Sequence, residues 1–153
     1  MPLTMIPEPV LKKKARKVTD CGKDLQKLID EMVGMMKYRN GTGIAAPQVG
    51  ESLRLIIVEH EDKMYVVANP EITQSSTEID INVESCLSVP NIAGEVERAI
   101  SITVKGQDRN GKPIKIKAKG WLARIFQHEI DHINGILIVE RAKELWQIKK
   151  EEN

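Results

Sequence analysis

The sequence predicts an α+β fold in which antiparallel strands pack around a central helix, with further helices near both ends of the chain. Two observations indicate this class. Apolar residues recur with helical period in the ranges 25–36 and 121–134, and strand-like runs fill the sequence between them. No helical pattern separates these strands, which argues against the alternating βαβ order of an α/β protein. We expect the range 1–153 to form a single domain with its own core.

Composition and charge exclude several classes of protein. The chain carries 23 basic and 22 acidic side chains, so neither nucleic acid nor an anionic membrane is expected as a partner. No segment has the pattern of a signal peptide or the length of a membrane span, and the cytoplasm is the expected location. Two cysteines are too few for a disulfide framework. The basic cluster at 12–17 is interpreted as a solvated face rather than an anion site.

The first elements are a proline-containing start and an amphipathic helix. Pro2, Pro7 and Pro9 predict an extended or turn-like start. Apolar residues at i, i+3 and i+4 spacing then predict a helix that packs one face on the core, with a cap at Thr19 or Asp20. The residues of this face are Leu25, Leu28, Ile29, Met32, Val33 and Met36.

The range 40–50 is expected to be a shaped loop. It contains three glycines and a proline in eleven residues, which a regular helix would not tolerate. Its Gly-x-Gly lacks the third glycine and the Lys-Ser/Thr of a phosphate-binding loop, so that interpretation is disfavoured. The glycines instead indicate a backbone that closely approaches another group, because glycine has no Cβ. Gln48 would then project a neutral amide from a rigid loop.

The middle of the chain is expected to be strands. Runs that are rich in β-branched residues or that alternate apolar and polar residues predict them. The expected strands cover 53–58, 64–68, 72–83, 96–105 and 113–118. Asn110-Gly111 marks a tight hairpin between the last two. His60 follows the first strand and is interpreted as an exposed turn residue.

The last third of the chain begins with a helix that glycines delimit. The helix is expected to begin after Gly120, and Asn134 with Gly135 predicts its C-terminal cap. The β-branched run at 136–139 predicts a returning strand. The charged range 142–152 predicts a short C-terminal helix.

The helix before Gly135 carries the motif His-Glu-x-x-His. His128 and His132 are four residues apart, so they share one face of the helix and can hold the same metal ion. Glu129 beside them can reach a water on that ion. The alternative is a pair of ordinary histidines, at the surface or in the core.

A catalytic site of the zinc type needs a third protein ligand and one open position. Cys86, His60 and several carboxylates are candidates in this sequence. A thiolate is a good ligand for zinc and for ferrous iron. A lone cysteine is more often a small buried apolar residue, but the nearby metal-binding motif favours a ligand role for Cys86.

Three segments of the chain resemble the motifs of the peptide deformylases, in the same order. These segments are 41–50, 84–88 and 127–132, and the resemblance extends over nearly the whole chain. It implies a peptide-deformylase-like α+β fold, with the motif helix among antiparallel strands. It also implies a hydrolase of linear amides that removes the N-formyl group from the N-terminal formylmethionine of new polypeptides, releasing formate.

The resemblance further implies how a metal would be held and used. Cys86, His128 and His132 would bind one divalent ion, with ferrous iron expected in the cell and zinc, nickel or cobalt able to occupy the site. The ion would lower the pKa of its water toward about 7. Glu129 would take the proton of that water and pass it to the leaving amine.

Substrate contacts are implied for the other two motifs. The amide of Gln48 and the backbone N–H of Leu87 would stabilise the developing oxyanion. Gly43 and Ile44 would offer backbone groups to an extended peptide. Ile125 would line a pocket for the methionine side chain. The expected partners are N-formylated nascent peptides and the expected state is a monomer, while ribosome contact has weak support because the range 144–153 is short and mixed in charge.

Two features near the second motif lead to specific expectations. Ser85 stands where the family has glycine, which would cost about 1 kcal/mol if that position needs a positive φ or a close backbone approach. Glu84 and Arg98 match a family acid–base pair that is expected to brace the motif, the alternative being a surface ion pair worth about 0–1 kcal/mol. Asp131 could orient a ligand histidine, or could be a charge on the helix surface.

Two other functions compete with deformylation. An inactive relative could bind metal and N-terminal peptides without turnover, but intact Glu129 and Gln48 argue against it. Another metal-dependent amidase or peptidase could use the same helix motif, but a cysteine ligand in place of the usual downstream Glu or His argues against that.

Overall fold

The structure is a computed structural model that describes residues 3, 9–86, 88–142 and 145–147. Its helices are α1 (Lys23–Tyr38), α2 (Trp121–Ile133) and α3 (Ile138–Arg141), with short 3-10 helices η1 (Pro9–Lys12) and η2 (Ala46–Val49). Its strands are β1 (Gly43–Ala45), β2 (Leu55–His60), β3 (Lys63–Ser75), β4 (Ile79–Cys86), β5 (Val89–Ala99), β6 (Ser101–Gln107), β7 (Pro113–Lys119) and β8 (Leu145–Gln147). This content confirms the predicted α+β class.

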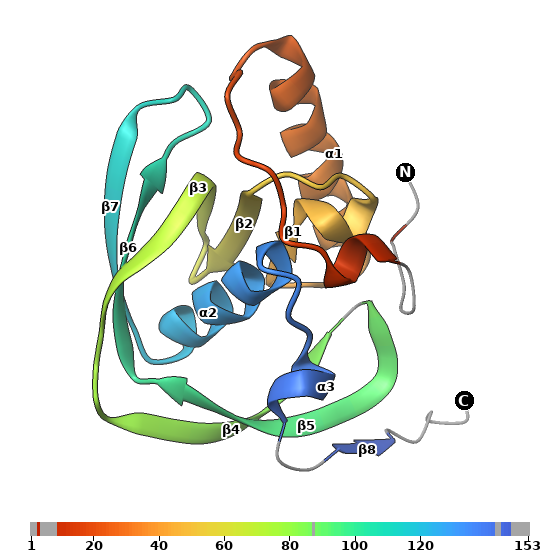
Figure 1. The fold of residues 1–153 in the computed structure, drawn as a ribbon, viewed down its shortest axis with the longest axis vertical. Coiled ribbons are helices and arrows are strands. Elements are labelled where there is room, and N and C mark those ends of the chain that lie inside the picture. Colours follow the sequence, from red (N-terminus) through yellow and green to blue (C-terminus); the bar gives the residue numbers. More distant parts are fainter. Residues whose placement is uncertain (1–2, 4–8, 87, 143–144, 148–153) are drawn as a thin grey trace.

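The strands form two sheets that curve around the central helix α2 (Figure 1). The order in one sheet is β1-β2-β3-β6-β7 and in the other β4-β5-β8, and the neighbouring strands of both pair antiparallel. Apolar side chains of α2 fill the space against the larger sheet, where the ring of buried Phe126 meets that of Tyr65 edge-on at 5.4 Å. This packing fixes the helix that carries the His-Glu-x-x-His motif.

The amphipathic helix is confirmed as α1, but its predicted cap is wrong. Five of the six predicted apolar positions are fully packed in the core, and the sixth, Val33, is partly buried against it. The helix begins at Lys23 after Gly22, without a side-chain cap. Asp20 instead accepts a hydrogen bond from the backbone N–H of Gly22 at 2.9 Å. Because the carboxylate of Asp20 accepts this bond from the residue two positions later, it does not cap the first turn of the helix.

The strand predictions are right in type, but two of the ranges join separate strands. A turn divides 72–83 between β3 and β4, and Ile100 divides 96–105 between β5 and β6. The hydroxyl of Ser76 stabilises the turn at the first break, because it donates to the carbonyl of Glu78 and accepts from the N–H of Ser101. The hairpin at Asn110-Gly111 is confirmed, with Gly111 at φ 84°.

His60 ends β2 rather than lying in the turn, and its side chain is partly exposed. The turn that follows consists of Glu61 and Asp62, which both have positive φ angles and connect β2 to β3.

The cap after α2 is confirmed, but the elements that follow it are not those predicted. Gly135 has φ 76°, and the N–H of Ile136 donates to the carbonyl of Asp131 at 2.9 Å, as in a Schellman motif. The expected strand at 136–139 is wrong, because α3 begins at Ile138, which is buried against β4 and β5. A short helix thus lies where a strand was expected.

Part of the predicted helix at 142–152 is strand instead. Residues of β8 pair with β5 and add a third strand to the smaller sheet, and this backbone pairing outweighs the local helical pattern. The rest of that range, apart from Ala142, lies outside the described residues. No helix in the described part of the chain is long and apolar enough to cross a membrane.

Candidate metal centre

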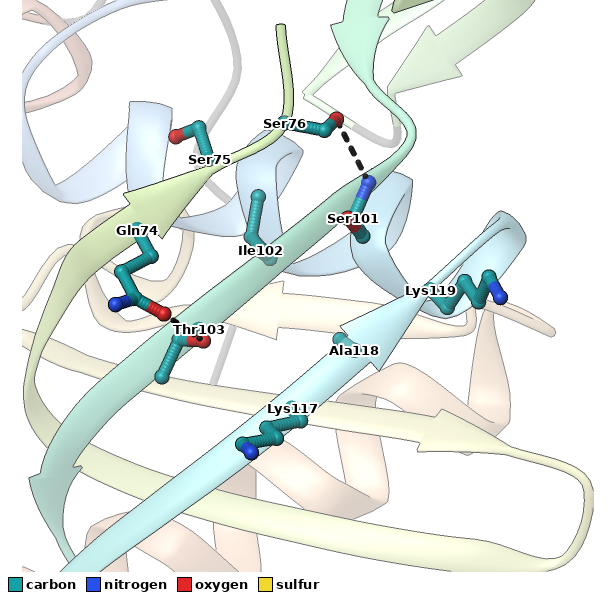
Figure 2. Close-up of a pocket in the computed structure, with 9 residues that line it drawn as sticks. All are labelled: Gln74, Ser75, Ser76, Ser101, Ile102, Thr103, Lys117, Ala118 and Lys119. Carbon is teal, nitrogen blue, oxygen red and sulfur yellow. Dashed lines mark hydrogen bonds between the residues drawn. The ribbon is translucent and has the colours of Figure 1, made fainter. Parts of the chain in front are cut away.

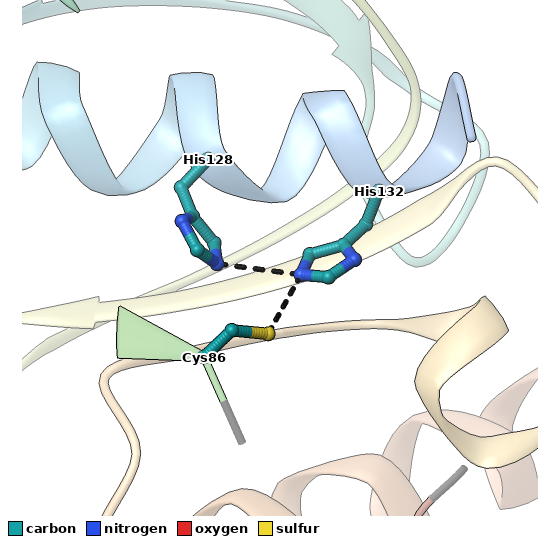
Figure 3. Close-up of side chains that lie close together, drawn as sticks. All are labelled: Cys86, His128 and His132. Atoms are coloured by element: carbon teal, nitrogen blue, oxygen red, sulfur yellow. Dashed lines mark hydrogen bonds between the residues drawn. The ribbon is translucent and has the colours of Figure 1, made fainter. Parts of the chain in front are cut away.

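The three predicted metal ligands lie together. His128 and His132 project from successive turns of α2, and Cys86 approaches them from the end of β4 (Figure 3). Nε2 of His132 is 3.2 Å from the sulfur of Cys86 and 3.3 Å from Nε2 of His128. One ligand atom from each residue lies within 4.8 Å of the others. His60, the other histidine considered as a ligand, is not part of this cluster and lies 3.8 Å from Glu61.

A change of register in the β4–β5 hairpin places Cys86. Ser85 pairs with Ala93, but Cys86 pairs with Val89, so the regular pairing is interrupted between Ser85 and Cys86. The φ angle of Ser85 is not positive and its side chain is exposed. The part of the expected cost that a positive φ would cause therefore does not arise for Ser85.

The charges around the cluster favour a thiolate. Burial alone would raise the pKa of the Cys86 thiol, but the neighbouring His132 and His128 hold that pKa well below its usual range. Burial alone would lower the pKa of His128, but hydrogen bonds with Cys86 and Glu84 hold it well above its usual range. A deprotonated sulfur beside imidazole nitrogens is the form of cysteine that binds a metal ion.

A buried carboxylate orients the first histidine. Oε1 of Glu84 lies 2.8 Å from Nδ1 of His128, which leaves Nε2 of that ring facing the cluster. Arg98 donates to both oxygens of Glu84, at 2.9 and 3.0 Å. The pair is not a surface ion pair, because the side chains of Arg98 and Glu84 are 3% and 6% exposed. Burial alone would raise the pKa of Glu84, but His128 and Arg98 lower it to about 2.

Asp131 braces this arrangement instead of touching a ligand histidine. It accepts hydrogen bonds from Arg98 at 2.5 Å and from Arg141 of α3 at 2.6 and 2.9 Å. The suggestion that Asp131 orients a ligand is therefore not supported.

Nδ1 of His132 is buried and has no hydrogen-bond partner among the described residues.

Glu129 is buried beside the metal-binding cluster. Its Oε1 lies 4.0 Å from Nε2 of His132 and has no hydrogen-bond partner in the described part of the chain. Burial raises the pKa of Glu129 to about 7. A Cβ placed on Gly43 would lie only 2.9 Å from Cγ of Glu129, and closer still to Oε2. The close approach that the glycines predicted is therefore the approach of Gly43 to Glu129.

The predicted oxyanion donor Gln48 faces the same cluster. It lies in η2 and is buried. Its Nε2 donates to the sulfur of Cys86 at 3.6 Å and to the hydroxyl of Ser88 at 3.2 Å, while its Oε1 accepts from the N–H of Ala45 at 2.9 Å. These contacts hold the amide rigidly in place. Leu87, the other predicted donor, lies outside the described residues.

The predicted substrate residues lie on β1 and α2. Gly43 and Ile44 belong to β1, which is at the edge of the larger sheet and pairs only with β2 among the described strands. Ile44 and Ile125 are buried in separate apolar clusters, Ile44 with α1 and Ile125 with the apolar face of α2. The predicted roles of these residues in peptide binding remain predictions.

Two further side chains secure α2, and sequence reasoning missed both. Gln127 uses its amide to bond both the N–H and the carbonyl of Ala99, at 3.0 and 2.9 Å. Arg124 is buried and bonds Glu84. The available signal was position, since Arg124 precedes His128 by four residues and so shares its face of the helix.

A pocket of about 750 Å³ shares no lining residue with the metal-binding cluster, and Figure 2 shows the residues that line it. It is lined by Gln74, Ser75, Ser76, Ser101, Ile102, Thr103, Lys117, Ala118 and Lys119. None of these is a candidate site residue, and the pocket holds no thiol, imidazole or carboxylate. The convergence of ligand atoms, not the size of a cavity, therefore defines the candidate site.

The raised pKa of Glu129 predicts an unusual pH dependence of stability. A carboxyl group whose pKa is raised by folding stabilises the protein below its unfolded pKa, near 4.5, and this contribution is lost as the pH rises through about 7. Glu129→Gln should therefore make the metal-free protein more stable than wild type at pH 8, by about 3 kcal/mol. Denaturant unfolding should show this difference shrinking toward pH 5. An equal difference at both pH values would contradict the buried carboxylate.

Comparison with known proteins identifies similar chains over nearly the whole length. The sequence model of the family described as polypeptide deformylase matches residues 1–147. The peptide deformylase of Dictyoglomus thermophilum is 49% identical over 137 residues, covering 90% of this chain and 89% of that protein. The crystal structure of peptide deformylase from Thermotoga maritima is 39% identical, with a TM-score of 0.91 and coverage of 94% and 97%. That of a peptide deformylase from Synechococcus elongatus in complex with actinonin is 36% identical, with a TM-score of 0.90 and coverage of 94% and 79%.

Proposed function

Because the chain belongs to the polypeptide deformylase family, we propose that it removes the N-formyl group from the N-terminal formylmethionine of nascent polypeptides. It is a metal-dependent hydrolase that releases formate from this linear amide. The observation that carries the proposal is the convergence of Cys86, His128 and His132 beside a buried carboxylate, Glu129.

The donor set fits one divalent ion. One thiolate and two imidazole nitrogens suit zinc and ferrous iron, and they leave a position open for substrate or water. The hydrogen bond that Nδ1 of His128 donates to Glu84 leaves Nε2 of that ring as its ligand atom. Ferrous iron is the ion we propose for the cell, with zinc, nickel or cobalt able to replace it. When bound, the ion would act as a Lewis acid and would lower the pKa of a coordinated water toward about 7.

Glu129 moves the proton in this scheme. Its raised pKa, about 7, allows it to accept and release a proton near neutral pH. Glu129 accepts a proton from the attacking water and later gives it to the amine that leaves. Its Oε1 has no partner among the described residues, so no competing hydrogen bond has to break first.

Gln48 and Leu87 stabilise the negative charge that develops on the formyl oxygen. The carbonyl oxygen of the Gln48 amide is held by the N–H of Ala45, which keeps the amide group at the site. Its Nε2 donates to Ser88 and Cys86, and one of these two bonds gives way to the bond with the formyl oxygen. The backbone N–H of Leu87 follows Cys86 directly in the chain, which makes it the second proposed donor.

The edge of β1 binds the peptide. Gly43 and Ile44 offer the backbone groups of this edge to an extended chain, which adds as another strand. Ile125 on α2 contributes to the apolar surroundings of the methionine side chain. We further propose that the protein is a monomer and acts in the cytoplasm on formylated nascent chains.

Formate release from formyl-Met-Ala-Ser tests the proposed function. The protein is reconstituted anaerobically with ferrous iron and compared with Glu129→Ala and with Glu71→Gln, a control at an exposed position. We expect turnover by wild type and the control, and about 10²–10⁴-fold less by Glu129→Ala. No formate release despite one bound ion per chain would refute deformylation. Cleavage of unblocked Met-Ala-Ser would indicate a peptidase instead.

A further inference from the structure

Arg124 is a buried cation that the proposed reaction does not use. Its side chain is 3% exposed, although arginine is rarely buried without a specific set of partners. It donates to Oε2 of Glu84, to the backbone carbonyl of Val96 at 3.0 Å, and to the side chain and carbonyl of Asp80 at 2.7 and 3.1 Å. These bonds join α2 to both β4 and β5.

Arg124 and His128 hold the same carboxylate from the same face of α2. Arg124 bonds Oε2 of Glu84, and Nδ1 of His128 bonds Oε1. The two residues are four apart, so they lie on successive turns of the helix. A carboxylate held at both oxygens from one helix has no freedom to rotate relative to that helix. The direction of Oε1, and with it the tilt of the His128 ring, is thereby fixed.

Arg98 provides this link only indirectly. It belongs to β5 and bonds both oxygens of Glu84, and it reaches α2 through a separate bond to Asp131. Arg124 fixes the same carboxylate relative to α2, which carries both ligand histidines. The guanidinium of Arg124 therefore sets the position of the sheet residue Glu84 against the helix residue His128.

We propose that Arg124 is a positioning residue of the metal centre, acting through Glu84 to hold Nε2 of His128 toward Cys86. This inference rests on the metal site of the proposed function. A positioning role differs from a general structural role for Arg124. A structural role would affect folding but would leave the affinity of the folded protein for the ion unchanged.

The first test measures metal affinity in Arg124→Met. Competition with a chelator gives the affinity for Zn²⁺, and the visible absorption of bound Co²⁺ reports the ligand geometry. We expect affinity to fall about 10- to 100-fold and the Co²⁺ spectrum to change. Arg109→Met is the matched control, because Arg109 is 41% exposed and contacts Asp30 and Gln26 at a distance from the cluster. It should bind Zn²⁺ as wild type does.

The second test asks whether Arg124 acts through Glu84. Glu84→Gln alone should weaken Zn²⁺ binding, and adding Arg124→Met to it should weaken binding little further. Losses that add fully in the double variant would overturn the inference, as would wild-type affinity in Arg124→Met with only its unfolding temperature lowered. If Arg124→Met does not fold, Arg124→Lys replaces it, since lysine keeps the charge but cannot bond three groups in a fork. Wild-type affinity and an unchanged Co²⁺ spectrum in folded Arg124→Lys would equally overturn it.

The two proposals fail in different ways. A wild-type protein that binds no Zn²⁺ or Co²⁺ would remove the metal site and the proposed function together. A wild-type protein that binds both ions and deformylates, beside an Arg124→Met variant with unchanged affinity, would remove only the role of Arg124.

Discussion

Gly43→Ala should abolish most of the turnover while leaving the metal in place. A Cβ at this position would lie 2.9 and 3.0 Å from Cγ and Cδ of Glu129, closer than carbon atoms normally approach. Glu129 is 3% exposed, so its carboxylate cannot swing into open solvent to relieve the clash. It must leave the position from which it exchanges protons. We therefore expect deformylation to fall by about 10²–10⁴-fold, as for loss of the carboxylate itself.

Metal content and a second glycine provide the controls for this variant. Among the described residues, the backbone of Gly43 forms no hydrogen bond with a ligand atom of the cluster. The affinity of Gly43→Ala for Zn²⁺ should therefore equal that of wild type. Gly34 lies inside α1, where an added Cβ would meet nothing within 4 Å. Gly34→Ala should keep full turnover and gain about 0.5–1 kcal/mol of stability from the lower entropy of the unfolded chain. Near-normal turnover in Gly43→Ala would show that Glu129 need not occupy its buried position.

The features that local sequence rules could predict are those set by short-range geometry. The helical spacing of His128 and His132 already places both on one face, and the structure brings them within reach of Cys86. The glycine-rich range 40–50 indicated a close backbone approach, and Gly43 makes one. In each case the spacing of a few neighbouring residues decides the result.

The features that could not be predicted depend on partners distant in sequence. β8 forms because β5 offers a free edge to it, which no pattern within residues 142–152 reveals. Glu84 and Arg98 are buried because the smaller sheet packs over α2. The positions of charged residues in the sequence do not predict that packing. Arg141 reaches Asp131 because the turn at Gly135 reverses the chain and brings this residue of α3 back to α2.

Glu84→Gln should destabilise the protein more than any surface substitution. Glutamine keeps the shape but removes the charge that compensates Arg98 and Arg124, both 3% exposed. Removing one partner of a buried ion pair leaves an uncompensated charge and costs about 3–5 kcal/mol. The bond that orients His128 is also weakened, so Zn²⁺ affinity should fall about 10- to 100-fold. Denaturant unfolding of the metal-free protein measures the first effect and chelator competition the second.

Acid unfolding separates the charge of Glu84 from its shape. A carboxyl group whose pKa is lowered by folding stabilises the protein above its unfolded pKa, near 4.5, and this contribution is lost as the pH falls toward about 2. The shift corresponds to about 3 kcal/mol. The stability difference between metal-free wild type and Glu84→Gln should therefore narrow between pH 4.5 and pH 2, whereas the exposed control Glu71→Gln should follow wild type throughout. A constant difference for Glu84→Gln would mean that lost packing, rather than the ion pair, causes the destabilisation.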